Sequence, residues 1–172
     1  GGTDWTEVNF AATDQSTDTP TNNFATMNPL DNFYVDATYS EGNLKVVTDA
    51  ADYSPVMSTI GVNSGKWYCE IKMINDGGTD NEFLVGIVST QATGTNEEVG
   101  NDATGYGYYG NDGNSRTGNS SSSYGDTYTE GDIVSIALNL DDNELKFYKN
   151  GTVQNSGTAI SITAAASTPL GN

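Results

Sequence analysis

Residues 106–151 read YGYYGNDGNSRTGNSSSSYGDTYTEGDIVSIALNLDDNELKFYKNG, and this stretch decides the fold class. In its second half, the apolar-rich runs 133–140 and 145–149 flank the polar residues DDNE at 141–144. Two such runs around a short segment of turn-forming residues are typical of a β-hairpin. The first half is rich in Gly, Tyr and Ser, and we interpret residues 111–123 within it as a polar loop.

Two further strands are predicted upstream of this stretch. Residues 66–74 (KWYCEIKMI) alternate between apolar and polar side chains, which indicates a half-buried strand with Trp67 as a core anchor. Residues 82–88 (EFLVGIV) are almost continuously apolar and predict a central strand. Gly86 in the middle of that strand predicts the close approach of another backbone or of a large side chain.

The remaining chain also favours β structure. A hairpin is predicted around the turn 40–43, and a short strand is predicted at 56–60. No segment sustains the apolar spacing of an amphipathic helix, and no internal repeat is visible. Strands separated by Gly-rich turns indicate an all-β fold of the sandwich type.

Composition excludes several function classes. The chain has 172 residues, 23 acidic against six basic side chains and a net charge of −17, so we expect neither nucleic-acid nor membrane binding. It contains no histidine, which removes Ser-His and Cys-His catalysis and histidine-ligated zinc. The single Cys69 is expected to be a buried structural thiol. We expect no cofactor.

Several short motifs together resemble those of SPRY domains. In chain order they are GKWYCE at 65–70, FLVGIV at 83–88, YGY at 106–108, GDIV at 131–134 with LNLD at 138–141, and LKFYKNG at 145–151. The resemblance implies a concanavalin-like sandwich of two antiparallel sheets that binds through loops at one rim and has no catalytic activity. Residues 168–172 end the chain where SPRY domains continue, so the resemblance also implies that the last strand is missing.

A second resemblance concerns residues 18–30 and 42–44, which are similar to the leader that precedes SPRY domains in bacteriophage virion and tail-associated proteins. Separately, the apolar side chains spaced through residues 1–31 indicate an extended N-terminal arm that packs on a sandwich over 32–172, with a flexible leader as the alternative. The second resemblance implies a structural or attachment component of a virion, oligomeric or part of a larger polypeptide. Its partners would be other virion or assembly proteins, a host-surface protein or a glycan. The alternative is a free lectin-like module of a bacterial surface or secreted protein, with an extracellular or cell-surface location.

The expected binding rim lies in the loops 89–104 and 111–123, where aromatic rings, amide and carboxylate groups and the only arginine gather. The candidate ligand-binding residues are Tyr108, Tyr109, Asp112, Asn114, Arg116 and Tyr124.

Three alternatives remain open for these and neighbouring residues. Tyr106, Tyr124 and Tyr128 either face the rim or close the core. Asp112 and Asn114, with Asp102 nearby, form either a calcium site or a plain turn. A glycosidase would need two facing carboxylates, and the strand 66–74 lacks such an acid pair. We therefore expect a non-enzymatic binding module without a metal site.

Overall fold

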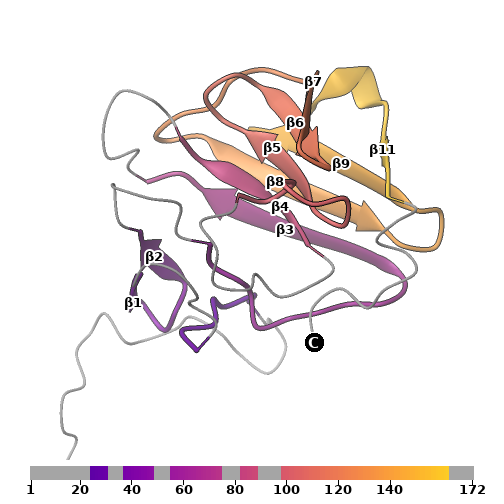
Figure 1. Cartoon of the computed structure of the whole chain (residues 1–172). Helices are drawn as coiled ribbons and strands as arrows, with labels where there is room; N and C mark the ends of the chain where they lie inside the picture. The colour runs from indigo at the N-terminus through magenta and orange to yellow at the C-terminus, as the bar shows by residue number, and fades with distance from the viewer. Residues whose placement is uncertain (1–23, 31–36, 49–54, 75–81, 89–97, 163–172) are drawn as a thin grey trace, which may run out of the picture. The chain divides into compact units, whose positions relative to one another are not determined.

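The computed structural model describes residues 24–30, 37–48, 55–74, 82–88 and 98–162 (Figure 1). The chain divides into two compact units, Gly1–Ile60 and Gly61–Asn172. Most of the predicted arm over 1–31, the first part of the predicted loop 89–104 and residues 163–172 lie outside the described residues. The packing of the arm and the absence of a last strand therefore stay predictions.

The first unit contains one small hairpin. Strand β1 (Thr38–Ser40) pairs antiparallel with β2 (Lys45–Val47), as the turn signal at 40–43 predicted. Glu41, Gly42 and Asn43 in the turn all have positive φ angles, which glycine and asparagine adopt most readily. The strand predicted at 56–60 is reduced to an isolated bridge between Ser58 and Met27.

The second unit holds two antiparallel sheets, and the first is built from the alternating segments of the sequence. Its strand order is β10-β9-β8-β3, and β11 also pairs with β9. The strands are β3 (Lys66–Lys72), β8 (Ile133–Asn139), β9 (Glu144–Lys149), β10 (Thr152–Val153) and β11 (Ile160–Ser161). A short 3₁₀ helix, η2 (Asn155–Gly157), connects β10 and β11. The predicted hairpin therefore forms the centre of this sheet, as β8 and β9.

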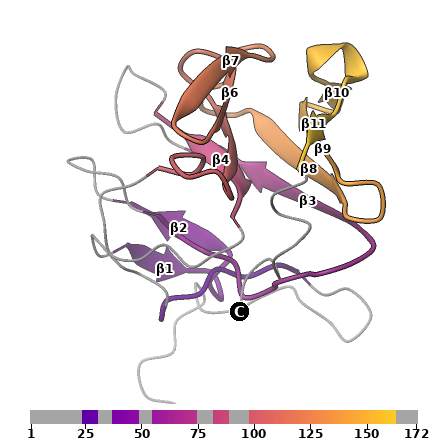
Figure 2. The ribbon, with the colours of Figure 1, turned by 45° about the vertical axis from the view of Figure 1, so that its right-hand side comes forward.

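The second sheet has the order β4-β5-β6-β7. Its strands β4, β6 and β7 are labelled in Figure 2. Its strands are β4 (Leu84–Ile87), β5 (Tyr106–Tyr109), β6 (Asn114–Thr117) and β7 (Ser120–Ser123). Residues 111–123 are thus largely a hairpin, and the interpretation of this segment as a loop was wrong. The Thr117–Ser120 pair encloses a two-residue turn in which Gly118 and Asn119 have φ angles of 56° and 58°. Such a turn matches the twist of paired strands, so the hairpin forms without apolar alternation.

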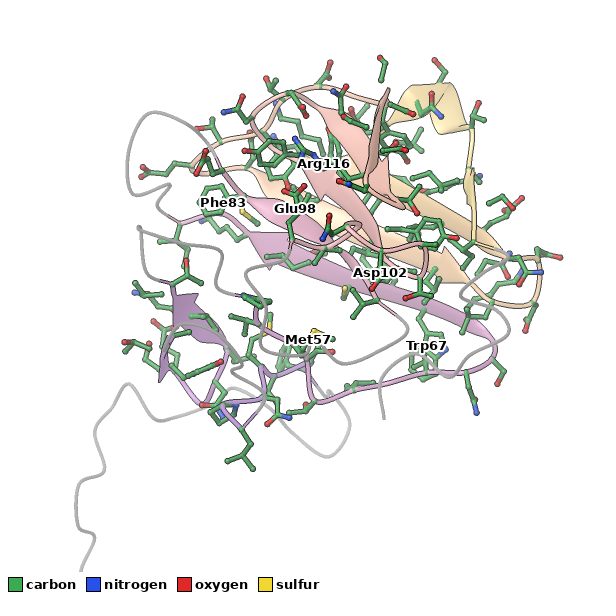
Figure 3. The ribbon with its side chains drawn as sticks, viewed as in Figure 1. Met57, Trp67, Phe83, Glu98, Asp102 and Arg116 are labelled. Atoms are coloured by element: carbon green, nitrogen blue, oxygen red, sulfur yellow. The ribbon has the colours of Figure 1, made fainter. Side chains whose placement is uncertain are left out.

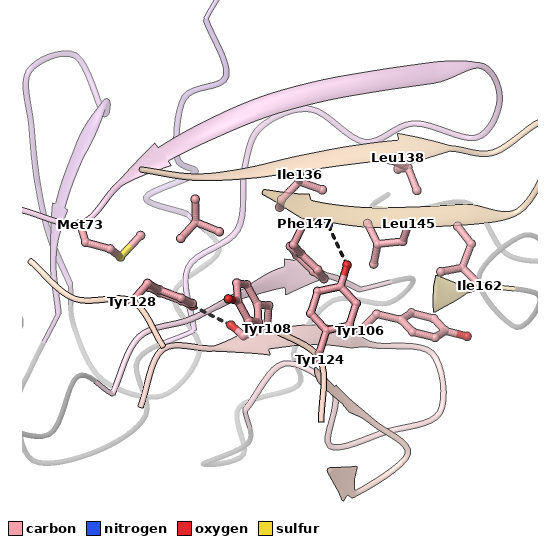
Figure 4. Close-up of a cluster of buried hydrophobic side chains, with 11 residues drawn as sticks. Met73, Tyr106, Tyr108, Tyr124, Tyr128, Ile136, Leu138, Leu145, Phe147 and Ile162 are labelled. Atoms are coloured by element: carbon pink, nitrogen blue, oxygen red, sulfur yellow. Dashed lines mark hydrogen bonds between the residues drawn. The ribbon is translucent and has the colours of Figure 1, made fainter. Parts of the chain in front are cut away.

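The two sheets pack face to face around a core that is unusually rich in tyrosine (Figure 4). The rings of Tyr108 from β5 and Phe147 from β9 have centroids 5.4 Å apart, so they join the two sheets directly. Tyr124 lies edge-on to both of these rings. The buried cluster is Met73, Tyr106, Tyr108, Tyr124, Tyr128, Val134, Ile136, Leu138, Leu145, Phe147 and Ile162. The sequence did not decide whether Tyr106, Tyr124 and Tyr128 face the rim or the core, and the structure places all three in the core.

The hydroxyls of Tyr108, Tyr124 and Tyr128 have hydrogen-bond partners. The Tyr128 hydroxyl lies 2.6 Å from the carbonyl of Tyr108 and 2.9 Å from that of Phe83. The Tyr124 hydroxyl accepts a hydrogen bond of 3.0 Å from the backbone N–H of Phe147, and the Tyr108 hydroxyl donates to the carbonyl of Asp126. Burial raises the pKa of Tyr108 and of Tyr128 far above the usual range. The rings therefore remain neutral members of the core, and their polar ends are satisfied.

Trp67 is not the core anchor that the alternating pattern predicted. Trp67 is 49% exposed, because β3 is the last strand of its sheet and, among the residues that the structure describes, has a strand neighbour, β8, on one side only. Its indole N–H donates a hydrogen bond of 2.8 Å to the carbonyl of Ser64 in the preceding turn. Cys69, two residues further along the same face, is half-buried against the core, and burial raises the pKa of its thiol.

Candidate protein-interaction site

The site begins with two glycines that let a loop lie directly on the outer face of the four-stranded sheet. Gly86 of β4 and Gly107 of β5 are opposite each other in the register, on the face away from the tyrosine core. A Cβ atom on Gly86 would lie 2.0 Å from the Tyr106 carbonyl oxygen and 2.8 Å from the Val99 side chain. A Cβ atom on Gly107 would lie 2.8 Å from the Val99 carbonyl oxygen. The close approach predicted at Gly86 is confirmed.

The loop that follows Val99 is bonded to the turn of the β6–β7 hairpin. The Gly118 N–H donates to the Asp102 carbonyl at 2.8 Å, and the Asn119 N–H donates to the Gly100 carbonyl at 3.2 Å. The carboxylate of Asp102 accepts hydrogen bonds of 2.6 Å from the hydroxyl and the backbone N–H of Thr104, and these bonds lower its pKa. Residues 98–104 and the hairpin turn therefore form one connected surface.

Arg116, the only arginine of the chain, lies on β6 close to Glu98 (Figure 3). Its Nη1 is 2.8 Å from Oε1 of Glu98, its Nη2 is 3.3 Å from Oδ2 of Asp112, and its guanidinium carbon is 4.2 Å from the centroid of the Tyr109 ring. Burial alone would lower the pKa of Arg116, but the hydrogen bond and negative charge of Glu98, with Asp112, raise it overall. We call Arg116, Tyr109, Glu98 and Asp112 the Arg116 cluster. Its ion pairs and cation–π contact fix the loop, the β5–β6 turn and β6 against one another.

A small polar hollow lies beside the cluster. It measures about 40 Å³ and is lined by Glu98, Gly100, Arg116, Asn119, Ser120 and Ser121. Nε of Arg116 and Oε2 of Glu98 are buried and have no hydrogen-bond partner among the residues that the structure describes. The cluster thus combines strong ion pairing with polar groups that are only partly satisfied.

Asp112 and Asn114 form a turn that is closed by its own hydrogen bonds. Asp112 accepts bonds from the Asn114 N–H at 2.9 Å and from the Asn114 side-chain amide at 3.0 Å. Within the described ranges, no group of three or more His, Cys, Asp or Glu side chains could hold a metal ion. The carboxylate of Asp112 is therefore committed to Asn114 and Arg116 and remains about one-third exposed.

The structure brings four of the six sequence candidates together: Tyr109, Asp112, Asn114 and Arg116. Tyr108 and Tyr124 lie apart from them in the core, where Tyr108 has no exposed surface. Sequence reasoning did not single out Glu98, which makes the shortest ion pair with Arg116. A signal was present, since one arginine among 23 acids is expected to have a carboxylate partner. Because the chain has 23 acidic side chains, the sequence alone did not identify Glu98 as that partner.

A family model of the SPRY domain matches residues 66–170, and the chain belongs to this family. SPRY domains are non-catalytic modules that mediate protein–protein interaction. The match begins at β3 and contains both sheets of the second unit, including the Arg116 cluster.

The chain is similar to part of several curated animal proteins. It is 37% identical to Ran-binding protein 9 of Xenopus laevis over 120 residues, which are 65% of this chain and 22% of that protein. It is 32% identical to Ran-binding protein 9 of Homo sapiens over 115 residues, or 64% of this chain and 15% of that protein. With the Ran-binding proteins 9/10 homolog of Drosophila melanogaster it shares 31% identity over 124 residues, covering 65% of this chain and 12% of that protein. The chain thus spans about a fifth or less of the length of these relatives.

These relatives correct the expected location. They are cellular proteins of animals, whereas the resemblance of residues 18–30 and 42–44 implied a virion, with an extracellular or bacterial-surface module as the alternative. The leader motif was short and rich in turn-forming residues, so its similarity carried little information about origin. In the described part of the chain, no helix has the length and apolarity that a membrane span requires.

Proposed function

We propose that this chain is a protein-binding module whose partner docks on the surface formed by the Arg116 cluster and the β6–β7 hairpin. The observation that carries the proposal is the fixed arrangement around Arg116. One guanidinium connects a loop, a turn and a strand through contacts of 2.8 Å, 3.3 Å and 4.2 Å. A surface that is ordered before binding loses less conformational entropy when a partner docks.

The chemistry of this surface favours a polar protein partner. Asp112 and Asn114 present polar groups, and Asn119 to Ser123 add exposed amide and hydroxyl groups next to the hollow. Arg116 already binds two carboxylates, so its role is to position the surface, and the partner's acids are not its target. The relatives' names also record a protein as the partner of those proteins.

A glycan partner receives less support. Sugar recognition commonly uses an exposed aromatic face for stacking. Tyr108 and Tyr124 are buried in the core, and the ring of Tyr109 is buried with the guanidinium of Arg116 over it. The candidate tyrosines therefore give the surface no exposed ring.

The proposal is tested by selecting linear peptides that bind the chain from a random yeast-display library, and by measuring their affinity calorimetrically. We expect Asp112→Lys to weaken binding of the selected peptides about tenfold or more, because it reverses a charge within the interface. Glu144→Lys is the matched control, since it makes the same charge change at an exposed position of β9 in the other sheet.

Loss of affinity in Glu144→Lys with unchanged affinity in Asp112→Lys would move the binding surface to the five-stranded sheet and contradict the proposal. If the library yields no binder, this result would count against the proposal that the chain is a protein-binding module.

A further inference from the structure

We infer that the partner binds as an extended, basic segment that adds a fifth strand to the open edge of β7. The inference rests on the proposed function and specifies how the partner is held: by backbone hydrogen bonds along β7, with charge selection by the acids beside it.

The first support is the register of the β6–β7 hairpin. Thr117 and Ser120 close the two-residue turn, and Arg116 pairs with Ser121, Ser115 with Ser122 and Asn114 with Ser123. In an antiparallel pair, hydrogen-bonded and non-hydrogen-bonded positions alternate, and the positions next to a two-residue turn are hydrogen-bonded. The backbone groups of Ser120 and Ser122 therefore face β6, while those of Ser121 and Ser123 point outward. In the part of the chain that the structure describes, these outward groups have no hydrogen-bond partner.

The second support is that β7 lacks the features that usually protect an edge strand. Natural edges are blocked by lysine, proline, bulges or very short strands. The edge strand β3 carries Lys66 and Lys72, and β10 and β11 have only two residues each. All four residues of β4 are partly covered. By contrast, all four residues of β7 are exposed serines, which are small and uncharged and leave the backbone accessible.

The third support is charge. On the face that Arg116 and Ser121 share, Glu98 and Asp112 supply two carboxylates against one guanidinium. Asp126 follows β7 and is exposed. The chain as a whole carries a net charge of −17. A lysine or arginine on the added strand, opposite Ser121 or Ser123, would lie on the same face as these acids. An acidic segment would be repelled there.

The test uses the ¹⁵N-labelled chain and the peptide acetyl-TKVKVTK-amide, with amide exchange followed by NMR. We expect the exchange of the Ser121 and Ser123 amides to slow about twofold when the peptide concentration equals its Kd, because half of the edges are then covered. The amides of Ser120 and Ser122 already face β6 and are expected to change less.

Two matched peptides separate the two parts of the inference. Acetyl-TKVKVTK-amide carrying N-methyl groups on the backbone nitrogens of its first two lysines has the same charge but cannot donate from the residues opposite Ser121 and Ser123, and acetyl-TEVEVTE-amide can pair but is acidic. We expect neither to protect Ser121 and Ser123. The variant Ser121→Pro, Ser123→Pro removes the two outward donors and is expected to abolish binding of the first peptide. Its thermal unfolding shows whether it remains folded.

Three results would overturn the inference. These are equal protection by the N-methylated peptide, equal protection by the acidic peptide, and no change at Ser121 and Ser123 with any peptide. If selected library peptides nevertheless depend on Asp112, the proposed function holds and only the strand-addition mode fails. All three results come from the wild-type chain, so the test does not depend on the folding of the proline variant.

Discussion

The two long hairpins of the second unit, β8–β9 and β6–β7, reach the same strand geometry by different means. In β8–β9, every second residue is apolar and buried, and Val134, Ile136, Leu138, Leu145 and Phe147 supply much of the core. In β6–β7, no side chain belongs to the buried cluster. That hairpin depends on a two-residue turn with two positive φ angles, on the loop 98–104 and on the ion pairs of Arg116. The apolar hairpin provides stability, and the polar one provides an accessible surface.

We expect the largest loss of stability from a substitution at the centre of the apolar β8–β9 hairpin. Phe147→Ala removes a ring with no exposed surface that contacts Tyr108 and Tyr124. We expect the free energy of unfolding to fall by about 3–5 kcal/mol, because burial is lost and a cavity remains. Urea unfolding followed by fluorescence measures it. The neighbouring Tyr148→Ala, which alters the other face of β9, serves as the control, and an equal loss there would contradict the assigned core.

The next effect concerns the contact between the loop and the polar sheet. Gly86→Ala places a methyl group 2.0 Å from the Tyr106 carbonyl oxygen and 2.8 Å from Val99, so strand or loop must move. We expect a loss of about 2 kcal/mol in the free energy of unfolding, together with NMR shifts in residues 98–104. Gly151→Ala is a useful contrast, since nothing lies within 4 Å of its Cβ position and only its φ of 78° opposes the change. Shifts at 98–104 in Gly151→Ala would argue against a local contact.

The third prediction concerns the Arg116 cluster, which holds the polar β6–β7 hairpin against the loop 98–104. Arg116→Ala leaves the carboxylate of Glu98, whose side chain is only 18% exposed, without its cation. We expect a loss of about 1–2 kcal/mol in unfolding free energy, less than for Phe147→Ala because the pair keeps some contact with water. A double-mutant cycle with Glu98→Gln should give a coupling of at least about 0.5 kcal/mol. Strict additivity of the two changes would show that the ion pair does not stabilise the loop.

The smallest effect is a pH dependence at the start of the apolar hairpin. Burial tends to raise the pKa of Asp132, but the N–H of Thr129, the Asn150 amide and the charge of Lys149 together lower it. A carboxyl with a lowered folded-state pKa stabilises the fold above its unfolded pKa of about 3.9, and this contribution disappears as the pH falls through the folded value. We expect Asp132→Asn to cost about 1 kcal/mol or less at pH 7.

The same variant should also lose less stability than wild type on acidification below the unfolded pKa. Urea unfolding at neutral and acidic pH measures the difference. Asp141→Asn, in the next turn, is the control. Parallel pH profiles for wild type and Asp132→Asn would contradict the assignment.

Strands with alternating apolar residues could be predicted from the sequence. Strands formed by pairing between polar segments could not. Strands β3, β4, β8 and β9 and the role of Gly86 follow from local patterns, because side chains on one face of a strand must be buried together. The β6–β7 hairpin was missed because its serines carry no apolar alternation, although Gly118-Asn119 is a pair typical of a two-residue hairpin turn. Trp67 was misplaced because alternation identifies a face but not whether the strand lies at the edge.

The candidate site was predictable in composition but not in arrangement. Tyr109, Asp112, Asn114 and Arg116 lie within eight residues of sequence, so their proximity followed from the chain itself. Tyr108 and Tyr124 could not be separated from them by residue type, since a tyrosine serves equally well in a core or on a surface. Glu98 reaches Arg116 from a distant loop, and no local pattern encodes such a contact.

The strand order has a consequence for how the domain assembles. Lys66 of β3 pairs with Asn139 of β8, and all four strands of the other sheet lie between them in the sequence. Closing that long loop costs more chain entropy than closing either hairpin. We therefore expect the hairpins to form early and β3 to join last, so that pulse-labelled amides are protected in β9 before β3. A nascent or partly denatured chain would then expose the flank of β8, and this transient state would be the one most prone to self-association.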